Sequence, residues 1–277
     1  MVLLVRHMAL FVFLIFLTAC SKALVPSTQK IIQEKYIDKN TSISGLDKYS
    51  RVLSGKDSQL LRRQINGSIK SCESIVLQDN ILYAKVYFFD SHVTACFSKL
   101  KERNGIIIDL RENHGGVLEE AISLVDMYLE SGVIIKKKSR DREHIYYAKK
   151  TNTYPDIPLV ILVDKGSASA SEIVAGSLQK HQRATIIGTT TFGKGTIQEI
   201  IPLQDQKILK LTVAKYYLPG DIDIEGKGIV PDIRLSSKYP HLHIKDKRLR
   251  PLLHYKFSKN MDNALLLAVH VLGLMKR

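Results

Sequence analysis

Two short segments of this 277-residue chain contain residue types that can together carry out acyl transfer. The first is Gly-Ser-Ala-Ser-Ala-Ser-Glu at 166–172, and the second is Thr-Phe-Gly-Lys-Gly-Thr-Ile-Gln at 191–198. A serine hydroxyl becomes a nucleophile when a base removes its proton, and a lysine can be that base if its pKa falls from about 10.4 toward neutrality. We therefore expect Ser169 to be a nucleophile and Lys194 its base.

The serine-rich segment is expected to join a buried strand to a helix. Residues 158–163 form a short, unbroken apolar run, which is typical of a central strand covered on both faces. Residues 172–181 have apolar side chains at helical spacing and basic ones in the last turn. A serine at the start of such a helix lies near free backbone N–H groups, which can bind an oxyanion. The plainer alternative is that these serines only cap the helix.

The lysine-containing segment follows a second predicted strand at 184–188. Lys194 stands between two glycines, which permit the close backbone approach that would bring the lysine stem into a site. Gln198, four residues later, would point to the same face if the segment is extended, and its amide would orient the amine without adding charge. The plainer alternative is a solvated lysine in a glycine turn.

Together these motifs resemble the catalytic core of the bacterial C-terminal processing, or tail-specific, serine peptidases. Members of that family carry a GSASASEI-type motif, then TFGKG-x-x-Q, and use a Ser-Lys dyad supported by the glutamine. The resemblance implies that Ser169 is the nucleophile, Lys194 the general base and Gln198 the residue that orients it. Some relatives have an aspartate close to the position of Lys180, and this departure does not touch the dyad.

A third segment is expected to complete the site. Residues 105–111 predict a second buried strand, residues 112–116 (ENHGG) a glycine turn, and residues 117–129 a helix. Two glycines in such a turn let the backbone offer an N–H group to an oxyanion. Taken alone, the pair equally fits a plain turn.

The family has a similar DLR-x-N-x-G-G segment that contributes to the oxyanion hole. The resemblance therefore assigns Gly115 and Gly116 to that hole, as partners of the N–H group of Ala170. His114 replaces the proline often found before the two glycines.

The first twenty residues predict export and lipid attachment. A basic start precedes an apolar segment at 8–16, which is too short to span a membrane, and Leu-Thr-Ala-Cys at 17–20 resembles the bacterial lipobox. In that motif the cysteine is diacylated and becomes the new N-terminus. We therefore expect an anchor at Cys20 in the bacterial cell envelope, facing the periplasm or the exterior. The alternative is an ordinary signal peptide cut near Ala19 or Ala23.

The rest of the chain is expected to form one catalytic core with flanking segments. We predict a signal peptide at 1–19, a tether at 20–45, an N-terminal helical segment at 46–74, a peptidase core at 75–235 and a C-terminal helical segment at 236–277. The core should begin with a strand at 75–89 and include one at 208–217, and an apolar helix is expected at 262–274. Alternating strands and helices predict an α/β fold. The family resemblance implies a crotonase/ClpP-like spiral core, and residues 226–232 match the family's closing G-K-G-I-x-P-D motif.

The family also leads us to expect a difference in how substrates are selected. A peptide-binding PDZ domain, which needs roughly 80 to 100 residues, ordinarily separates the N-terminal helical segment from the core. That length is absent between the two segments predicted here. The resemblance therefore implies a protein or peptide substrate, with a PDZ-type or adaptor partner as one means of selecting it.

The composition of the chain limits the classes of partner that we expect. The formal net charge is +14, but the basic residues are spread over several short groups, so we expect a solvated basic surface, with attraction to anionic lipid heads as the alternative. No nucleic-acid-binding motif is present, and nucleic acid is not an expected partner. Cys72 and Cys96 can form a disulfide or remain as two buried thiols. The histidines form no metal-binding pattern, and neither a metal nor a cofactor is expected.

Two classes of function remain open. The first is an envelope serine endopeptidase that forms an acyl-enzyme and acts on C-terminal tails or flexible proteins. The second is a catalytically weak envelope lipoprotein of the same fold, which binds peptides or a partner protein. The joint presence of Ser169, Lys194 and Gln198 favours the peptidase.

Overall fold

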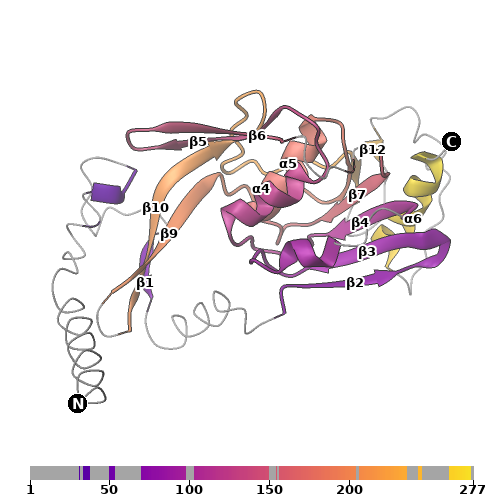
Figure 1. The fold of residues 1–277 in the computed structure, drawn as a ribbon, viewed down its shortest axis with the longest axis horizontal. Coiled ribbons are helices and arrows are strands. Elements are labelled where there is room, and N and C mark those ends of the chain that lie inside the picture. Colours follow the sequence, from indigo (N-terminus) through magenta and orange to yellow (C-terminus); the bar gives the residue numbers. More distant parts are fainter. Residues whose placement is uncertain are drawn as a thin grey trace, which may run out of the picture. The chain divides into compact units, whose positions relative to one another are not determined.

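The structure, a computed structural model, describes a defined part of the chain (Figure 1). The described residues are 31, 34–37, 50–53, 70–97, 103–149, 154, 156–203, 206–235, 243–244 and 262–275. They belong to two compact units, of which the smaller comprises residues 1–59 and 198–213 and the larger residues 60–197 and 214–277. The predicted signal peptide, Cys20 and most of the predicted tether lie outside the described residues.

The larger unit is built on a seven-stranded sheet with the order β12-β11-β8-β7-β4-β3-β2. Its central strands β4 (Gly105–Asp109), β7 (Leu159–Val163) and β8 (Thr185–Gly188) are parallel and buried at every residue. Parallel strands covered on both faces need apolar side chains throughout, which explains the unbroken apolar run in each. The predicted central strand at 158–163 is confirmed as β7.

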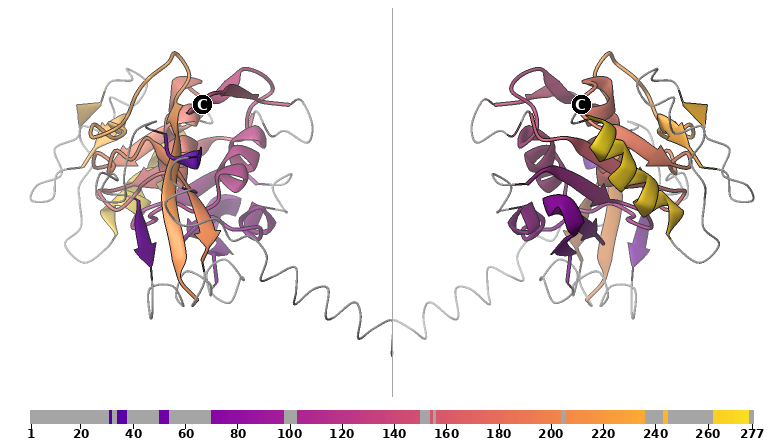
Figure 2. Two further views of the ribbon diagram at one scale, coloured as in Figure 1. Left: turned by 90° about the vertical axis from the view of Figure 1, so that its left-hand side faces the viewer. Right: turned by 90° about the vertical axis from the view of Figure 1, so that its right-hand side faces the viewer.

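Helices cover both faces of this sheet, which makes the larger unit a mixed α/β fold. Ile106 and Ile108 of β4 share a core with α4 (Leu118–Asp126) and α5 (Ala170–Lys180), whereas Ile107 packs in a second core with α6 (Asn263–Met275). Adjacent strand residues face opposite sides, so one strand supplies both cores. Figure 2 shows α4 and α6 on opposite sides of the unit. The helices expected at 117–129, 172–181 and 262–274 are confirmed.

The strand expected at 75–89 is a hairpin instead. β2 (Cys72–Val76) and β3 (Ile81–Val86) pair in antiparallel fashion, and a short 3-10 turn, η2 (Gln78–Asn80), connects them. Asp79 and Asn80 have φ values of 58° and 57°, a left-handed conformation that Asp and Asn tolerate better than most residues. The apolar residues on either side concealed this turn in the sequence.

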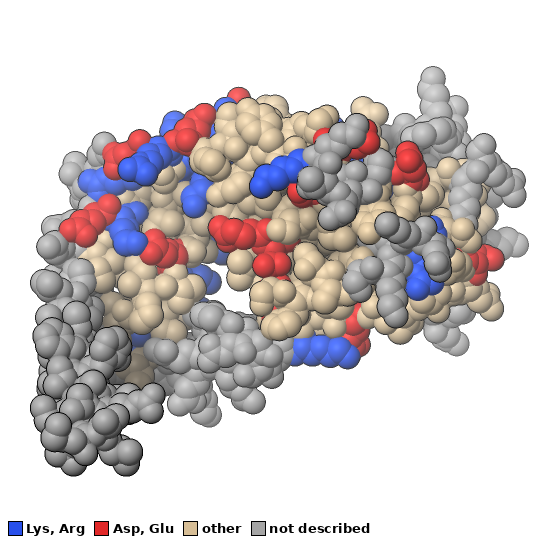
Figure 3. All heavy atoms as spheres, viewed as in Figure 1, with Lys and Arg blue, Asp and Glu red and all other residues tan. Residues whose placement is uncertain are grey.

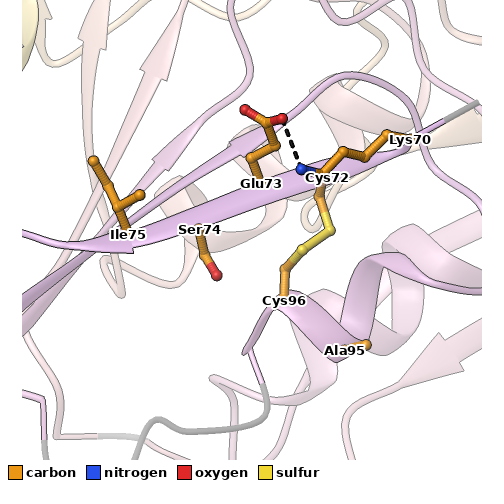
Figure 4. A pocket seen from close by; sticks show the side chains of 7 residues that line it. All are labelled: Lys70, Cys72, Glu73, Ser74, Ile75, Ala95 and Cys96. Carbon is orange, nitrogen blue, oxygen red and sulfur yellow. Dashed lines mark ion pairs between the residues drawn. A yellow bond between two sulfur atoms is a disulfide. The ribbon is translucent and has the colours of Figure 1, made fainter.

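A disulfide joins Cys72 to Cys96 in the short helix η3 (Val93–Phe97), and this settles the choice left open by the sequence. The bond closes a separation of 24 residues and ties η3 to β2. Figure 4 shows the disulfide beside a hollow along β2, together with an ion pair between Lys70 and Glu73 at 2.8 Å. The hollow is lined by Lys70, Cys72, Glu73, Ser74, Ile75, Ala95 and Cys96. The predicted catalytic residues are not among them.

A second group of strands in the larger unit forms a charged hairpin. β5 (Val133–Ser139) pairs with β6 (Glu143–Tyr147) and with the end of β10 (Ile208–Tyr217), whose limits match the predicted strand. Lys136 makes ion pairs with Glu143 and Asp221. Figure 3 shows basic and acidic side chains intermixed over this hairpin, so opposite charges interrupt its basic run.

The smaller unit corrects two predictions. β1 (Arg51–Leu53) pairs with the beginning of β10, so this part of the predicted helical segment at 46–74 is a strand. Ile31 and Tyr36, inside the predicted tether, are 4% and 2% exposed and pack with Leu209 and Leu211. Burial of these two side chains against β10 shows that Ile31 and Tyr36 themselves are not solvated, as residues of a tether would be.

Short strands complete the described chain. β9 (Thr196–Pro202) pairs with β10, and β11 (Ile233–Arg234) pairs with β8 and with β12 (His243–Ile244). β12 lies in the predicted C-terminal helical segment, which is therefore not helical throughout. None of the helices in the described ranges has the length and apolar character needed to cross a membrane.

Candidate active site

The nucleophile motif forms a tight turn between β7 and α5. Two of its three serines, Ser167 and Ser171, are fully buried and donate their hydroxyl hydrogens to the carbonyl oxygens of Leu110 and Asn113, at 2.8 and 2.9 Å. Ser169, between them, is only partly buried and is the N-cap residue of α5. The neighbouring serines therefore anchor the turn, and Ser169 is the one serine of the three that solvent can reach.

Ser169 has an unusual backbone conformation, with φ 57° and ψ −114°. A residue with a side chain seldom adopts such values, which cost on the order of 1–3 kcal/mol and persist only where surrounding contacts enforce them. Such strain at a serine between a strand and a helix is typical of nucleophile turns in acyl-transfer enzymes.

Glu172 supplies contacts that enforce this conformation. Its carboxylate is fully buried and accepts the N–H group of Ser169 at 2.9 Å. The same carboxylate accepts the N–H groups of Gly193 and Lys194, at 2.6 and 2.8 Å, and the hydroxyl of Thr191 at 2.5 Å. One side chain therefore binds the backbones of both predicted catalytic segments.

Tyr216 of β10 makes a second connection between the same segments. Its hydroxyl lies 2.9 Å from the carbonyl oxygen of Lys194 and 3.2 Å from that of Ser169. Burial, followed by the negative charge of Glu172, raises the pKa of Tyr216 well above its ordinary value, so the hydroxyl remains a donor at all ordinary pH values. Both predicted catalytic residues are thus fixed through their amide and carbonyl groups.

The oxyanion-hole segment lies directly against the nucleophile turn. A Cβ atom added to Gly115 would lie 2.9 Å from the Cβ of Ser169 and 3.1 Å from the amide nitrogen of Ala170, which explains why this position requires glycine. The amide of Ala168 donates to the carbonyl oxygen of Asn113 at 2.9 Å, which joins the two loops. The structure therefore brings the predicted residues Gly115, Ser169 and Ala170 together.

The two glycines of this segment have different roles. The N–H group of Gly115 donates to the Asn113 side chain at 2.8 Å, and its carbonyl accepts the N–H of Phe89 at 3.0 Å. The carbonyl oxygen of Phe89 in turn accepts the N–H of Val117 at 2.9 Å. The N–H of Gly116 takes no part in this bridge between Phe89 and Gly116. Gly115 is therefore occupied in shaping the loop, and Gly116 is the better candidate for an oxyanion donor.

Residues around the turn add further connections. The carboxylate of Asp164 accepts N–H groups from Glu112, Gly166 and Ser167, at 2.9, 2.9 and 3.1 Å. The ring Nδ1 of His114 lies 3.0 Å from the carbonyl oxygen of Gly166, so His114 spans the same two loops.

Gln198 belongs to the smaller unit, where its Nε2 donates to the hydroxyl of Thr212 at 3.2 Å. Its predicted role in orienting Lys194 stays a prediction.

Sequence reasoning missed Glu172, Tyr216 and Asp164. A signal for Glu172 was present, since Ser169 followed three residues later by Glu matches a helix capping box. Nothing near Tyr216 in the sequence links it to Ser169, because 47 residues separate the two. Among the described residues, His, Cys, Asp and Glu side chains form no group of three or more that could hold a metal ion.

A family model described as peptidase family S41 matches residues 80–235, which is more than half of the chain. The chain belongs to peptidase family S41. This match covers the nucleophile turn, the lysine loop and the oxyanion-hole segment, and it confirms the predicted kinship with C-terminal processing peptidases.

Similar proteins of this family carry matching names. The chain is 47% identical over 138 residues to a carboxy-terminal-processing protease of Bartonella bacilliformis, covering 49% of this chain and 32% of that protein. It is 43% identical over 129 residues to a carboxyl-terminal-processing protease of Synechocystis, covering 47% and 30%. The chain thus spans about a third of the length of the curated relatives it matches.

Solved structures agree on the fold. The photosystem II D1 C-terminal processing protease superposes with a TM-score of 0.53 at 31% identity, covering 61% of this chain and 49% of that one. A lipoprotein from Streptococcus agalactiae gives a TM-score of 0.57 at 20% identity, covering 76% and 77%. The second likeness concerns the fold alone.

Proposed function

We propose that this protein is a serine endopeptidase in which Ser169 and Lys194 form the catalytic dyad. The observation that carries the proposal is the Glu172 carboxylate, which binds the backbone N–H groups of Ser169 and Lys194 at 2.9 and 2.8 Å. A dyad gains rate only if nucleophile and base keep a fixed relation, and a shared buried anchor supplies that relation.

The proposed reaction begins when Ser169 Oγ attacks the carbonyl carbon of the scissile amide while neutral Lys194 takes the hydroxyl proton. The N–H groups of Gly116 and Ala170 stabilise the resulting oxyanion. The C–N bond then breaks, Lys194 passes its proton to the leaving amine, and an acyl-enzyme remains. Water, deprotonated by Lys194, hydrolyses the ester and regenerates Ser169. We assign Gln198 the role of orienting Lys194 because the resemblance to the family implies it.

C-terminal tails or flexible proteins are the proposed substrates. The Bartonella and Synechocystis relatives are named for carboxy-terminal processing, and this supports a tail-directed activity. The lipobox-like Cys20 supports a lipid-anchored location in the cell envelope. Selection of tails by a PDZ-type or adaptor partner, and a crotonase/ClpP-like spiral core, remain parts of the proposal.

The test is labelling of the purified protein with a fluorophosphonate probe, followed by hydrolysis of a flexible protein such as casein. Ser169→Ala should lose the label and all hydrolysis. Lys194→Arg should be inactive as well, because a guanidinium with a pKa above about 12 stays charged and cannot accept the proton. Absence of both label and hydrolysis in the parent protein would instead support the peptide-binding lipoprotein.

A further inference from the structure

In the segment Gly193, Lys194 and Gly195, which contains the proposed base, every backbone N–H and carbonyl group is hydrogen bonded. The N–H groups of Gly193 and Lys194 donate to Glu172, and that of Gly195 donates to the carboxylate of Glu225 at 2.8 Å. Their carbonyl oxygens accept the amide of Gly226 at 2.9 Å, the hydroxyl of Tyr216 at 2.9 Å and the amide of Tyr216 at 2.9 Å. Each of these six groups therefore has a named partner.

Glu225 belongs to the loop that follows β10. The turn there is well defined, because the amides of Lys227 and Gly228 both donate to the carbonyl oxygen of Ile224, at 2.9 and 3.0 Å, and Ile224 is only 2% exposed. The amide of Glu225 itself donates to the side chain of Asp223 at 2.9 Å. The backbone that carries the Glu225 carboxylate is thus fixed on both sides.

The same loop packs closely on the lysine segment. A Cβ atom added to Gly228 would lie 2.3 Å from the carbonyl oxygen of Thr191, and one added to Gly195 would lie 3.3 Å from the amide nitrogen of Glu225. The first approach leaves no room for a Cβ atom at Gly228, and the second would be closer than most Cβ contacts at Gly195. They place the Glu225 carboxylate at the peptide that follows Lys194.

We propose that Glu225 is a positioning residue for Lys194, an inference that rests on the proposed function. Glycine fixes its own conformation poorly, so the peptide between Lys194 and Gly195 depends on outside partners for its orientation. Glu172 binds the N–H group of the peptide that precedes the Lys194 Cα atom, and Glu225 binds that of the peptide that follows it. Release of the second contact lets the lysine stem shift, and a displacement of about 1 Å in a catalytic group can cost on the order of 100-fold in rate.

Burial distinguishes Glu225 from Glu172. Glu172 is fully buried, whereas Glu225 is only partly buried. Water can reach the Gly195 amide once the Glu225 carboxylate is gone, so its loss should leave the fold intact and act on the catalytic step.

The test compares Glu225→Ala, Glu225→Gln and Glu225→Asp in steady-state hydrolysis of a quenched fluorescent peptide. We expect Glu225→Ala to lower kcat by about 10- to 100-fold while KM stays within about 2-fold, since the base acts in the chemical step and does not bind substrate. Glu225→Gln should retain kcat within about 3-fold, because its amide oxygen can accept the same N–H group. Glu143→Ala, which removes an exposed carboxylate from β6, is the matched control and should behave as the parent.

Three results would overturn the inference. They are a parent-like kcat in Glu225→Ala, equal impairment of the Gln and Ala variants, and an effect confined to KM. If Glu225→Ala fails to fold, Glu225→Asp decides, because it keeps the charge but withdraws the carboxylate, and a parent-like kcat there overturns the inference. A parent protein that leaves Ser169 unlabelled by the fluorophosphonate overturns the proposed function and this inference together, whereas a labelled parent confines any failure to the inference.

Discussion

Glu172 and Asp109 are both buried carboxylates of the larger unit, but their partners differ in kind. Glu172 lies on the α4–α5 side of the sheet and accepts three backbone N–H groups and one hydroxyl. A backbone N–H group can move only when its chain moves, so these bonds fix the shape of two loops. Glu172 thus belongs to the candidate active site.

Asp109, at the end of β4, is bound mainly by side chains, since it accepts only one backbone N–H group, that of Arg111 at 3.0 Å, among the described residues. It accepts the hydroxyl of Tyr83 at 2.8 Å, the ammonium of Lys85 at 3.2 Å and the guanidinium of Arg111. Arg111 also pairs with Asp262, the residue immediately before α6, at 2.7 Å. These bonds join β3, β4 and α6 to one another. A buried carboxylate bound by backbone groups thus sets local geometry, while one bound mainly by side chains holds elements together.

The largest expected effect is on activity, at Glu172. Glu172→Ala should lower kcat/KM by about 1000-fold, or about 4 kcal/mol, because both catalytic loops lose their shared anchor. The unpaired buried N–H groups should also reduce stability, by about 1–3 kcal/mol each. Fluorophosphonate labelling and peptide hydrolysis, at a temperature where circular dichroism shows folded protein, measure the first effect. Near-parent activity in folded Glu172→Ala would contradict the role of Glu172 as the anchor of both catalytic loops.

Asp109→Asn should reduce the stability of the fold more than its activity. Removal of one member of a buried charge network leaves Arg111 and Lys85 poorly compensated, so the free energy of unfolding should fall by about 3 kcal/mol. Activity of the folded variant should stay within about 3-fold of the parent. Urea unfolding measures the loss, with Glu73→Gln as a control, because the ion pair of Glu73 with Lys70 is exposed and contributes little to stability. A loss of activity greater than the loss of folded protein would show that Asp109 also acts on catalysis.

Acid should weaken the same network. Burial alone would raise the pKa of Asp109, but hydrogen bonds and charge from Arg111, aided by Lys85, outweigh it and hold the pKa below its ordinary value. The pKa of Asp262 is lowered by Arg111 in the same way against its own burial. A carboxyl with a lowered folded pKa stabilises the fold above its unfolded pKa of about 3.9, and this stabilisation is lost as pH falls through the folded value.

We therefore expect the free energy of unfolding of the parent to decrease as pH falls below about 5. Asp109→Asn should show a flatter decrease over the same range, because it lacks one of the two titrating groups. Urea titrations between pH 3 and pH 7 provide the measurement. Parallel curves for the two proteins would argue against Asp109 as a source of the acid sensitivity.

The smallest expected effect is at the start of α6. The carboxylate of Asp262 accepts the amides of Ala264 and Leu265, both at 3.1 Å, and so caps the helix as well as pairing with Arg111. Asp262→Ala should cost about 1 kcal/mol. Asp262→Asn, which retains a capping oxygen, should cost less, and thermal melting of both variants ranks them. A greater loss in the Asn variant would show that charge outweighs capping here.

Local sequence determined the central elements and the identity of the catalytic candidates. The runs that became β4 and β7 are apolar at nearly every position, and such runs are stable only between two apolar layers. Helical spacing predicted α5 and α6, and the resemblance to the family's two short motifs assigned catalytic roles to Ser169 and Lys194. In each case the information lies within about ten residues, where propensity and pattern act.

Tertiary structure decided what joins these elements. Glu172 binds Lys194 across 22 residues, Glu225 binds Gly195 across 30, and Tyr216 binds Ser169 across 47, and no local pattern records these contacts. The burial of Ile31 and Tyr36 against β10 likewise depends on packing against a strand far away in the sequence. Sequence therefore supplied the reactive groups, while long-range hydrogen bonds and packing, which form only in the folded chain, set their geometry.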